Sequence, residues 1–402
     1  MNLARIAAGL LLPLLAGTAA AQFSGNAIRI GVLSDMSSLY ADGTGMGSVA
    51  AARLAVEDSG LERRGIKVEV VFADHHNKPD VGLTVARRWY DVEGVDVIVD
   101  VPNSSVALAV SELTREKNRV FLASGAGSSD LTGKACSPNT VHWTYDTWSL
   151  ANGTARFVTR AGGTTWFFVT ADYAFGHALE RDAAAAIARD GGRSVGAVRV
   201  PLNTADFGSF LMQAQASKAK VIGLANAGGD AQTAMKQAGE FGIVKGGQRV
   251  AGLLMGLTDV HALGLAAAQG LTMTEAFYWD TNDGTRAFAR RFAPMHRGIH
   301  PNAIHAGVYS ALLHYFKAVQ ALASDADGAA IVARMKATPT DDPLFGKGLV
   351  RADGRKTHAM HLVEVKSPAE SRAPWDYYKV VSTIPAEDAF RPLAEGGCPL
   401  VR

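Results

Sequence analysis

Small polar residues gather at two points where a predicted buried strand gives way to a loop. The strand Val95–Val101 is followed by Pro-Asn-Ser-Ser at 102–105, and the strand Arg119–Ala123 by Ser-Gly-Ala-Gly-Ser-Ser at 124–129. Hydroxyls, a side-chain amide and backbone N–H groups can hold a carboxylate by hydrogen bonds without a counter-ion. Neither loop pairs a nucleophile with a base, so the residues indicate capture of a small carboxylate-bearing molecule rather than catalysis. The alternative is a pair of ordinary strand-to-helix turns, which use the same residue types.

The chain between the two loops is expected to bring them together. An amphipathic helix is predicted at about Val106–Glu116, so that strand, helix and strand form a βαβ unit with parallel strands. The carboxyl ends of such strands open on the same edge of the sheet, where open parallel sheets bind ligands. The candidate binding residues Asn103, Ser104, Ala126 and Ser128 all lie at this edge.

Other chemistries are disfavoured by spacing. The glycines of residues 43–47 start nine residues after a strand and lack the spacing of a dinucleotide fingerprint. The adjacent residues Asp74, His75 and His76 point apart, and no further ligand is spaced to complete a metal site. No G-x-S-x-G motif occurs in the sequence. We therefore predict no cofactor, no metal and no catalytic residue.

Length and composition bound the number of domains and the kinds of partner. A chain of 402 residues is longer than one hydrophobic core usually holds, so two domains are predicted. Hydrophobic residues make up 48% and charged residues 19%, an ordinary globular composition. The formal net charge is +2 and the charges are mixed along the chain, so neither nucleic acid nor a membrane surface is expected as a partner.

The N-terminus carries the pattern of an export signal. Arg5 is followed by an apolar run at Ile6–Leu15 and by three alanines at 19–21, which predicts a signal peptide at residues 1–21 and a mature chain from Gln22. The run is shorter than the roughly 20 residues of a membrane span, and no cysteine offers a lipid attachment site. We therefore expect a periplasmic protein without a membrane anchor.

The only two cysteines of the sequence are Cys136 and Cys398. An isolated pair in an oxidising compartment is usually bonded, so we predict a disulfide between them. Such a bond would attach the C-terminal tail to the first half of the chain. The alternative is two free thiols.

Strands alternate with helices in two successive series. The first has strands at 28–34, 66–73, 95–101 and 119–123, and the second has strands at 165–170, 195–200, 220–224, 249–254 and 271–274. This alternation predicts two doubly wound α/β units whose parallel sheets are covered on both faces. Long helices are predicted next at 285–296, 302–323 and 328–336, with late strands at 347–351, 358–366 and 375–381.

Several segments together carry a family pattern, namely IRIGVLSDMS, VFADHHNKPD, VDVIVDVPNSS, FLASGAGSSDL, FFVTADYAFGHALERD and TEAFYWD. In their order and spacing the chain resembles the leucine/isoleucine/valine-type periplasmic solute-binding proteins of ABC importers. The resemblance implies two Rossmann-like lobes joined by a three-strand hinge, a ligand cleft between them, and delivery to a membrane permease. We predict a first lobe at 22–143 plus about 281–340, a second at 144–280 plus about 341–383, and a tail at 384–402.

The resemblance also implies roles for individual residues. The carboxylate of the ligand would be held by Asn103 or Ser104, by a backbone group of Ala126 and by the hydroxyl of Ser128. In the second lobe, the aromatic residue that covers the ligand falls on Phe175, with Tyr173 two residues before it. An acidic family position near the hinge falls on Trp148.

Two departures from the family concern the ammonium group of the ligand. Amino-acid binders have a tyrosine where this chain has Ala227 and Gly228, and a glutamate where it has Leu254. Glu275, between apolar residues at the end of another strand, could replace that glutamate, although a neighbouring Lys or Arg is an equally good partner. Without an ammonium site, the cleft would suit a flat or aromatic acid, bounded by Tyr145, Trp148, Tyr173, Phe175 and Phe277.

Tyr40, Tyr145 and Trp148 are predicted as walls of the cleft, with loop or interface packing as the alternative. Asn226 and Gly228 are predicted to face the ligand from the second lobe. We expect a monomeric receptor that closes by a hinge motion over a small carboxylate-bearing solute of the branched-chain amino acid type. The alternatives are a receptor for aromatic or other non-amino acids, an exported ligand sensor, and an exported enzyme acting on small acids.

Overall fold

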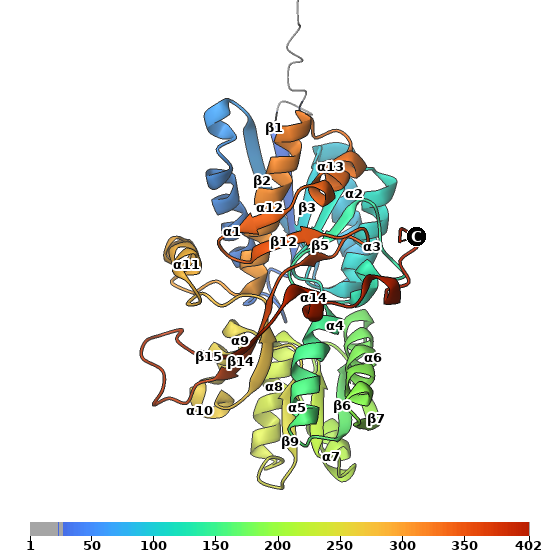
Figure 1. The fold of residues 1–402 in the computed structure, drawn as a ribbon, viewed down its shortest axis with the longest axis vertical. Helices are drawn as coiled ribbons and strands as arrows, with labels where there is room; N and C mark the ends of the chain where they lie inside the picture. The colour runs from blue at the N-terminus through green and yellow to red at the C-terminus, as the bar shows by residue number, and fades with distance from the viewer. Residues whose placement is uncertain (1–22, 24–26, 402) are drawn as a thin grey trace, which may run out of the picture.

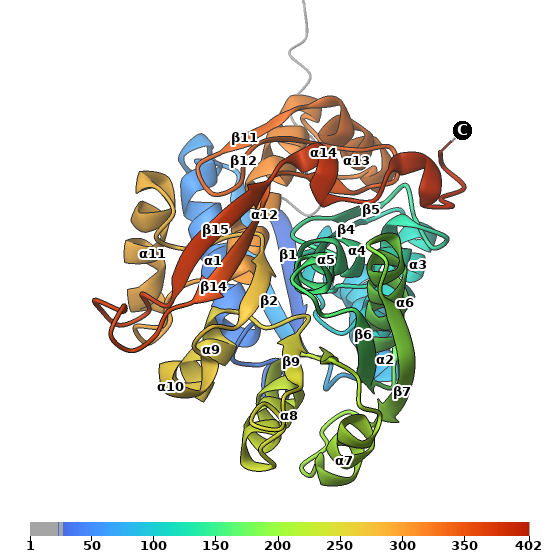
Figure 2. The ribbon, with the colours of Figure 1, turned by 60° about the horizontal axis from the view of Figure 1, so that its bottom comes forward.

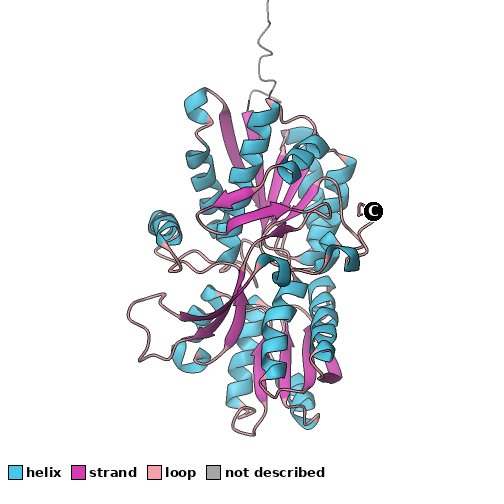
Figure 3. Ribbon diagram, viewed as in Figure 1, coloured by secondary structure: helices cyan, strands magenta, loops and turns pink. Residues whose placement is uncertain are grey.

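Two α/β lobes lie one above the other along the long axis of the molecule (Figure 1). The structure, a computed structural model, describes residue 23 and residues 27–401, so the predicted signal peptide lies outside the described residues. Each lobe contains a parallel sheet flanked by helices, which Figure 3 shows by secondary structure. The predicted fold class, two Rossmann-like lobes with parallel sheets, is confirmed.

The first lobe is built on a five-stranded parallel sheet with the order β2-β1-β3-β4-β5. Every residue of β3 and β4 is buried, because these central strands are covered by helices on both faces. The strands are β1 (Ala27–Ser34), β2 (Lys67–Asp74), β3 (Val97–Asp100), β4 (Val120–Ala123) and β5 (Thr140–His142).

Helices from distant parts of the sequence cover this sheet. On one face, α1 (Gly45–Ser59) packs against α12 (Ala303–Leu322), and α13 (Gly328–Ala337) joins the same core. A side chain at Gly47 would overlap the imidazole of His305, so glycine is required where these two helices approach most closely. On the other face lie α2 (Pro79–Arg88) and α3 (Ser104–Glu116), while α11 (Asp283–Met295) contacts α1.

The second lobe repeats the plan with a four-stranded parallel sheet of order β7-β6-β8-β9. Its strands are β6 (Thr165–Ala171), β7 (Arg193–Val200), β8 (Val221–Ala225) and β9 (Arg249–Gly252). Its helices are α4 (Thr147–Leu150), α5 (Arg156–Arg160), α6 (Ala174–Arg189), α7 (Gly208–Ala216), α8 (Gly228–Glu240), α9 (Leu257–Leu263) and α10 (Leu265–Ala268).

The strand expected at 271–274 does not join this parallel sheet. It forms β10 (Thr272–Glu275), which pairs antiparallel with β14 (Met360–Val365), and β14 pairs antiparallel with β15 (Tyr378–Ile384). Figure 1 and Figure 2 both show β14 and β15 running side by side. The prediction of a further parallel strand was wrong because the partner of β10 comes from far along the chain, which strand periodicity does not reveal.

A second antiparallel sheet consists of β11 (Thr340–Asp342), β12 (Gly346–Val350) and β13 (Lys356–Thr357), and it contacts α13 and α14 (Ala386–Ala389). The chain passes between the lobes near residues 143–146, 276–282 and 358–359, and it returns to the first lobe after β15, where the tail is bonded to that lobe. The residue limits predicted for each lobe stay a prediction.

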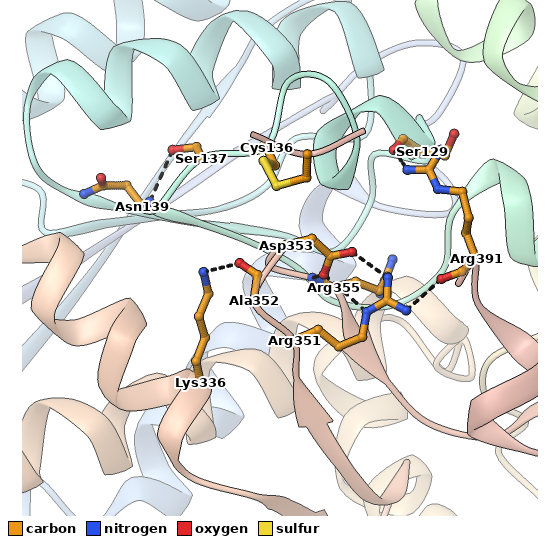
Figure 4. Close-up of a disulfide and its surroundings, with 11 residues drawn as sticks. Ser129, Cys136, Ser137, Asn139, Lys336, Arg351, Ala352, Asp353, Arg355 and Arg391 are labelled. Atoms are coloured by element: carbon orange, nitrogen blue, oxygen red, sulfur yellow. Dashed lines mark hydrogen bonds and ion pairs between the residues drawn. A yellow bond between two sulfur atoms is a disulfide. The ribbon is translucent and has the colours of Figure 1, made fainter. Parts of the chain in front are cut away.

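A disulfide fastens the C-terminal tail to the first lobe, as predicted. Cys136 and Cys398 are bonded, with 5.6 Å between their Cα atoms and a separation of 262 positions in the sequence (Figure 4). Hydrogen bonds support the attachment, since Arg391 donates to the carbonyl of Ser129 (3.1 Å) and Arg351 donates to the carbonyl of Arg391 (2.7 Å). The tail is therefore an integral part of the first lobe.

Candidate ligand-binding cavity

A cavity lies between the two lobes at the carboxyl ends of strands from both parallel sheets. Its walls come from the loops after β1, β3 and β4 in the first lobe and after β6, β8 and β9 in the second, together with the end of β10. It contains about 790 Å³ of empty space, part of which is open to solvent. Six of the residues predicted for the site line it, namely Tyr40, Tyr145, Tyr173, Phe175, Gly228 and Glu275.

Aromatic side chains from both lobes form one wall of the cavity. The hydroxyls of Tyr40 and Tyr173 are 2.6 Å apart, a hydrogen bond that joins the first lobe to the second. A Cβ on Gly127 would lie 2.7 Å from Cε2 of Phe175, so the ring packs directly on the backbone of the loop after β4. Tyr145 donates from its hydroxyl to the carbonyl of Gly125 (2.8 Å). These contacts hold the two lobes closely together on this side of the cavity.

Glu275 lies at the end of β10, where its carboxyl is almost entirely buried at 5% exposure. The hydroxyl of Tyr378 donates to its Oε1 at 3.2 Å. Burial raises the pKa of Glu275 to about 8, because the hydrogen bond from Tyr378 offsets only part of the lost hydration and the charge of Asp259 adds to the rise. A Glu with these surroundings would be stabilised in its ionised form by a ligand cation.

Asp259 is a second buried carboxyl in the same wall. It lies in the first turn of α9. Its carboxylate accepts hydrogen bonds from Gln232 Nε2 (2.7 Å) and from the backbone N–H of Gly256 (2.8 Å). Burial is the main cause that raises its pKa. A Cβ on Gly256 would lie 3.8 Å from Oδ2 of Asp259 and 3.9 Å from Oε1 of Glu275, so the two carboxyls flank one point of the wall.

The backbone at the exit of β3 is strained. Asp100 has φ 79° and the β-branched residue Val101 has φ 54°, a region that L side chains rarely occupy. The two residues precede Pro102, which lines the cavity. The carboxyl of Asp100 is buried behind the loop, accepts from Ser34 Oγ (2.8 Å), and has its pKa raised by burial to about 6. Strain of this kind is typical of loops that position a ligand site.

The polar residues predicted to hold a carboxylate do not line the cavity. The side chain of Asn103 caps α3 by accepting from the N–H groups of Ser105 (3.0 Å) and Val106 (3.2 Å). Ser104 Oγ accepts from the N–H groups of Gly127 (3.3 Å) and Ser128 (3.1 Å). Asn103 is thus engaged by the helix that follows it, and Ser104 joins the two loops.

The remaining members of this set are also engaged within the protein. Ser128 Oγ accepts from the N–H of Asp130 (3.3 Å), and the carbonyl of Ala126 is 2.7 Å from Nε2 of His142. Both Ser128 and Ala126 are fully buried. Direct ligand contact by Asn103, Ser104, Ala126 and Ser128 stays a prediction, and the structure gives them a part in shaping the edge of the cavity.

The fold and the cavity can be compared with known proteins. A family model described as "Periplasmic binding protein" matches residues 27–371. A crystal structure of a periplasmic binding protein from Burkholderia mallei is 47% identical, with a TM-score of 0.91, over 94% of this chain and all of that chain. The chain belongs to the periplasmic binding protein family.

Two further relatives place this binding protein within the family. A branched chain amino acid ABC transporter periplasmic ligand-binding protein from Burkholderia xenovorans is 40% identical (TM-score 0.81), over 93% of this chain and 99% of that one. The Leu/Ile/Val-binding protein homolog 6 of Brucella melitensis is 25% identical over 79% of this chain and 81% of its own length. The resemblance to leucine/isoleucine/valine-type binding proteins of ABC transporters is therefore confirmed, as is the type I fold. The family consists of solute-binding proteins and implies a small-molecule ligand and a permease partner.

Three other predicted residues of the binding protein lie outside the lining. Trp148 stacks with the guanidinium of Arg189, whose Cζ is 5.3 Å from the ring centroid, and faces a separate groove beside the C-terminal segment. The amide of Asn226 is buried next to the lining residue Ala227 and has no hydrogen-bond partner among the described residues. Phe277 packs against Phe288 and Phe345 in the core. Their contact with ligand stays a prediction.

Some lining residues of the binding protein were not predicted. Asp42, Gln232 and Asp259 line the cavity, as does the N-terminal end of α12 at Asn302. Asp259 follows Gly256 by three residues, which is the spacing of a helix N-terminal cap. This spacing was the sequence signal available for Asp259. That signal predicts a helix start, while the position of the helix at the cavity depends on the tertiary structure. Among the described residues, no helix has the length and apolar character needed to cross a membrane.

Proposed function

We propose that this binding protein captures a small amino-bearing solute in the periplasm and presents it to the permease of an ABC importer. The observation that carries the proposal is the interlobe cavity, in which the buried carboxyls of Glu275 and Asp259 flank one point of the wall. Buried carboxylates need a cationic or hydrogen-bonding partner, and an ammonium group of the solute would supply both.

Hydrogen bonds between the two lobes support a closing motion. The backbone N–H of Gly229 in the second lobe donates to the carbonyl of Leu39 in the first (3.0 Å). Ser129 Oγ of the first lobe donates to Oδ2 of Asp182 on α6 (2.7 Å). A solute that binds the closed arrangement better than an open one would shift the population toward closure, and the permease would read the closed shape.

The chemistry of the cavity favours an amino-bearing solute over an aromatic acid. A solute binding protein of R. palustris, crystallised in complex with benzoate, has the same fold at 21% identity and a TM-score of 0.81. In the present chain benzoate would offer no cationic partner to the buried carboxyls of Asp259 and Glu275. A branched-chain amino acid would instead place its ammonium group against Glu275. No bond of the solute is proposed to be broken.

Isothermal titration calorimetry with protein freed of bound solute by unfolding and refolding tests the proposal. Branched-chain amino acids, small organic amines and benzoate form the panel, and Glu275→Gln is the test variant. Glu364→Gln is a matched control, because Glu364 lies on the neighbouring strand β14 and pairs with Lys379 (2.7 Å) outside the cavity. We expect an amino-bearing solute to bind the wild type and the control and to bind Glu275→Gln at least tenfold more weakly. Binding of benzoate alone, unaffected by Glu275→Gln, would refute the proposal.

A further inference from the structure

We propose that a groove on the far side of the hinge from the cavity holds the solute-free protein open, the hinge being the segments where the chain crosses between the lobes. The two walls of the groove carry opposite charges, which lie apart in this structure and would pair when the lobes separate. Such pairing would set the open population against which a solute must work to close the protein. The inference concerns the hinge and is independent of which solute the cavity binds.

The groove lies between the second lobe and the segment that follows β15. It contains about 1270 Å³ of empty space, part of which is open to solvent. One wall is the helical segment 148–160 together with Arg189, and the other is the segment 384–395, which includes α14. The walls are joined at one point, where the side-chain amide of Asn152 donates to the carbonyl of Asp388 (2.7 Å). The groove is therefore bounded by two parts of the chain that are distant in sequence.

A helix separates the groove from the cavity. Leu150 lines the cavity, whereas Trp148 and Asn152 line the groove. Side chains two positions apart on a helix point about 200° apart around its axis, so the two spaces lie on opposite sides of this helix. The helix directly follows the crossing between the lobes at residues 143–146.

The strands at the second crossing have the same arrangement. Thr274 on β10 lines the cavity, and its cross-strand partner Leu362 on β14 lines the groove. β10 leads into the crossing at residues 276–282. Because the crossings lie between the two spaces, a rotation about them that opens the cavity narrows the groove.

The two walls belong to different lobes. The wall after β15 is fastened to the first lobe by the disulfide Cys136–Cys398 and by a hydrogen bond from Arg391 to the loop after β4. The opposite wall consists of helices of the second lobe. In this structure the hydroxyls of Tyr40 and Tyr173 join the lobes across the cavity, so this is the arrangement in which the groove is wide.

The second-lobe wall is basic. Arg156, Arg160 and Arg189 line it. Arg156 and Arg160 share the carboxylate of Asp190, at 2.9 and 3.0 Å, so their charges are partly neutralised on their own side. Arg189 stacks on Trp148 and has no carboxylate partner among the described residues. Its guanidinium is therefore available to a carboxylate of the opposite wall.

The first-lobe wall is acidic. Glu387, Asp388 and Glu395 line it, and all three are exposed to solvent. In the part of the chain that the structure describes, no ion pair spans the groove. An exposed ion pair changes an equilibrium constant by up to about fivefold, and salt weakens it. Contact between Arg189 and these carboxylates would therefore favour the open form by a measurable factor.

The distance between spin labels on the two lobes, measured by pulsed electron paramagnetic resonance, tests the inference in protein freed of solute. Lys78→Cys and Asp172→Cys provide the labelling sites, because these exposed residues follow β2 and β6. The native disulfide is kept. The distance distribution gives the ratio of closed to open molecules at low and at high salt.

The test variants are Arg189→Gln, a tail variant and the combination of the two. The tail variant carries three substitutions, Glu387→Gln, Asp388→Asn and Glu395→Gln. A matched control removes the same charge at exposed positions outside the groove, with Glu62→Gln, Glu116→Gln and Glu240→Gln.

We expect the wild type to be mostly open at low salt, with a ratio of closed to open molecules that rises as salt is added. At low salt Arg189→Gln and the tail variant should each raise this ratio by about two- to fivefold. The combination should raise it no further than the tail variant alone, because the carboxylates that Arg189 would meet are then absent. The tail variant should not respond to salt, and the control should behave as the wild type.

An unchanged or lowered ratio in the tail variant, or an equal rise in the control, would overturn the inference. A further rise in the combination would assign the effect to contacts other than these ion pairs and would overturn it as well. A solute-free wild type without an open population would have the same consequence. Since no solute is added, none of these results depends on the solute proposed for the cavity.

Discussion

Replacement of Glu275 by Gln is expected to stabilise the solute-free protein at alkaline pH. The pKa of Glu275 rises from 4.5 to about 8 on folding, so between these values the folded chain keeps a proton that the unfolded chain has lost. The free energy of unfolding of the wild type therefore falls as the pH rises through this window. At about 1.4 kcal/mol per pKa unit, the full effect is about 5 kcal/mol, an upper value that structural relaxation would reduce. The glutamine side chain of the variant has no such proton to lose and avoids this cost.

Urea unfolding of solute-free wild type and Glu275→Gln, below and above the pH window, measures the difference. The two proteins should have similar free energies of unfolding at the acidic end, and the variant should be more stable by several kcal/mol at the alkaline end. Glu364→Gln serves as the matched control on the adjacent strand. A bound amine should remove the difference, because it supplies a counter-charge to Glu275. If the difference in free energy of unfolding between wild type and variant were constant across the window, the conclusion that folding raises the pKa of Glu275 would be refuted.

Three other predictions follow from contacts between distant segments. Reduction of the disulfide Cys136–Cys398, which closes a loop of 262 residues, should lower the free energy of unfolding by about 2–5 kcal/mol in a denaturant titration, and an unchanged midpoint would contradict its stabilising role. Tyr173→Phe leaves the hydroxyl of Tyr40 in the first lobe unpaired, so the dissociation constant of the solute should rise by an amount equivalent to about 1–3 kcal/mol. Equal affinity would show that this hydrogen bond does not contribute to closure. Gly127→Ala would put a methyl group 2.7 Å from a ring of the second lobe, and scattering should show incomplete closure with solute, whereas full closure would mean that the ring moves freely aside.

Much of the fold was predictable because it depends on local patterns. The continuous apolar runs of β3 and β4, with an amphipathic helix between them, determine a parallel pair of strands whose ends share an edge. The disulfide followed from two cysteines and an export signal. The antiparallel pairing of β10 was not predictable in this way, because its partner β14 lies far along the chain.

The candidate site was predictable only in part. Glu275 was identified because a carboxylate among apolar residues at a strand end needs a partner, and Tyr40 because it follows the first strand at the same sheet edge, whereas Tyr173 and Phe175 were identified through the family resemblance. Asp259 was missed because an acid in the first turn of a helix has a sufficient local explanation as a cap.

The sequence by itself determined which groups reach the edges of the two sheets, since strand length and the residues that follow each strand are local properties. The tertiary structure decided which of these groups face the cavity. Ser104 turns toward backbone N–H groups of the adjoining loop and Ser128 toward the N–H of Asp130 in its own loop, whereas Glu275 and Asp259 converge from separate elements around Gly256. The physical reason is that hydrogen bonds are directional and short, so a polar side chain binds the nearest donor or acceptor that folding brings to it. That neighbour usually comes from another part of the chain.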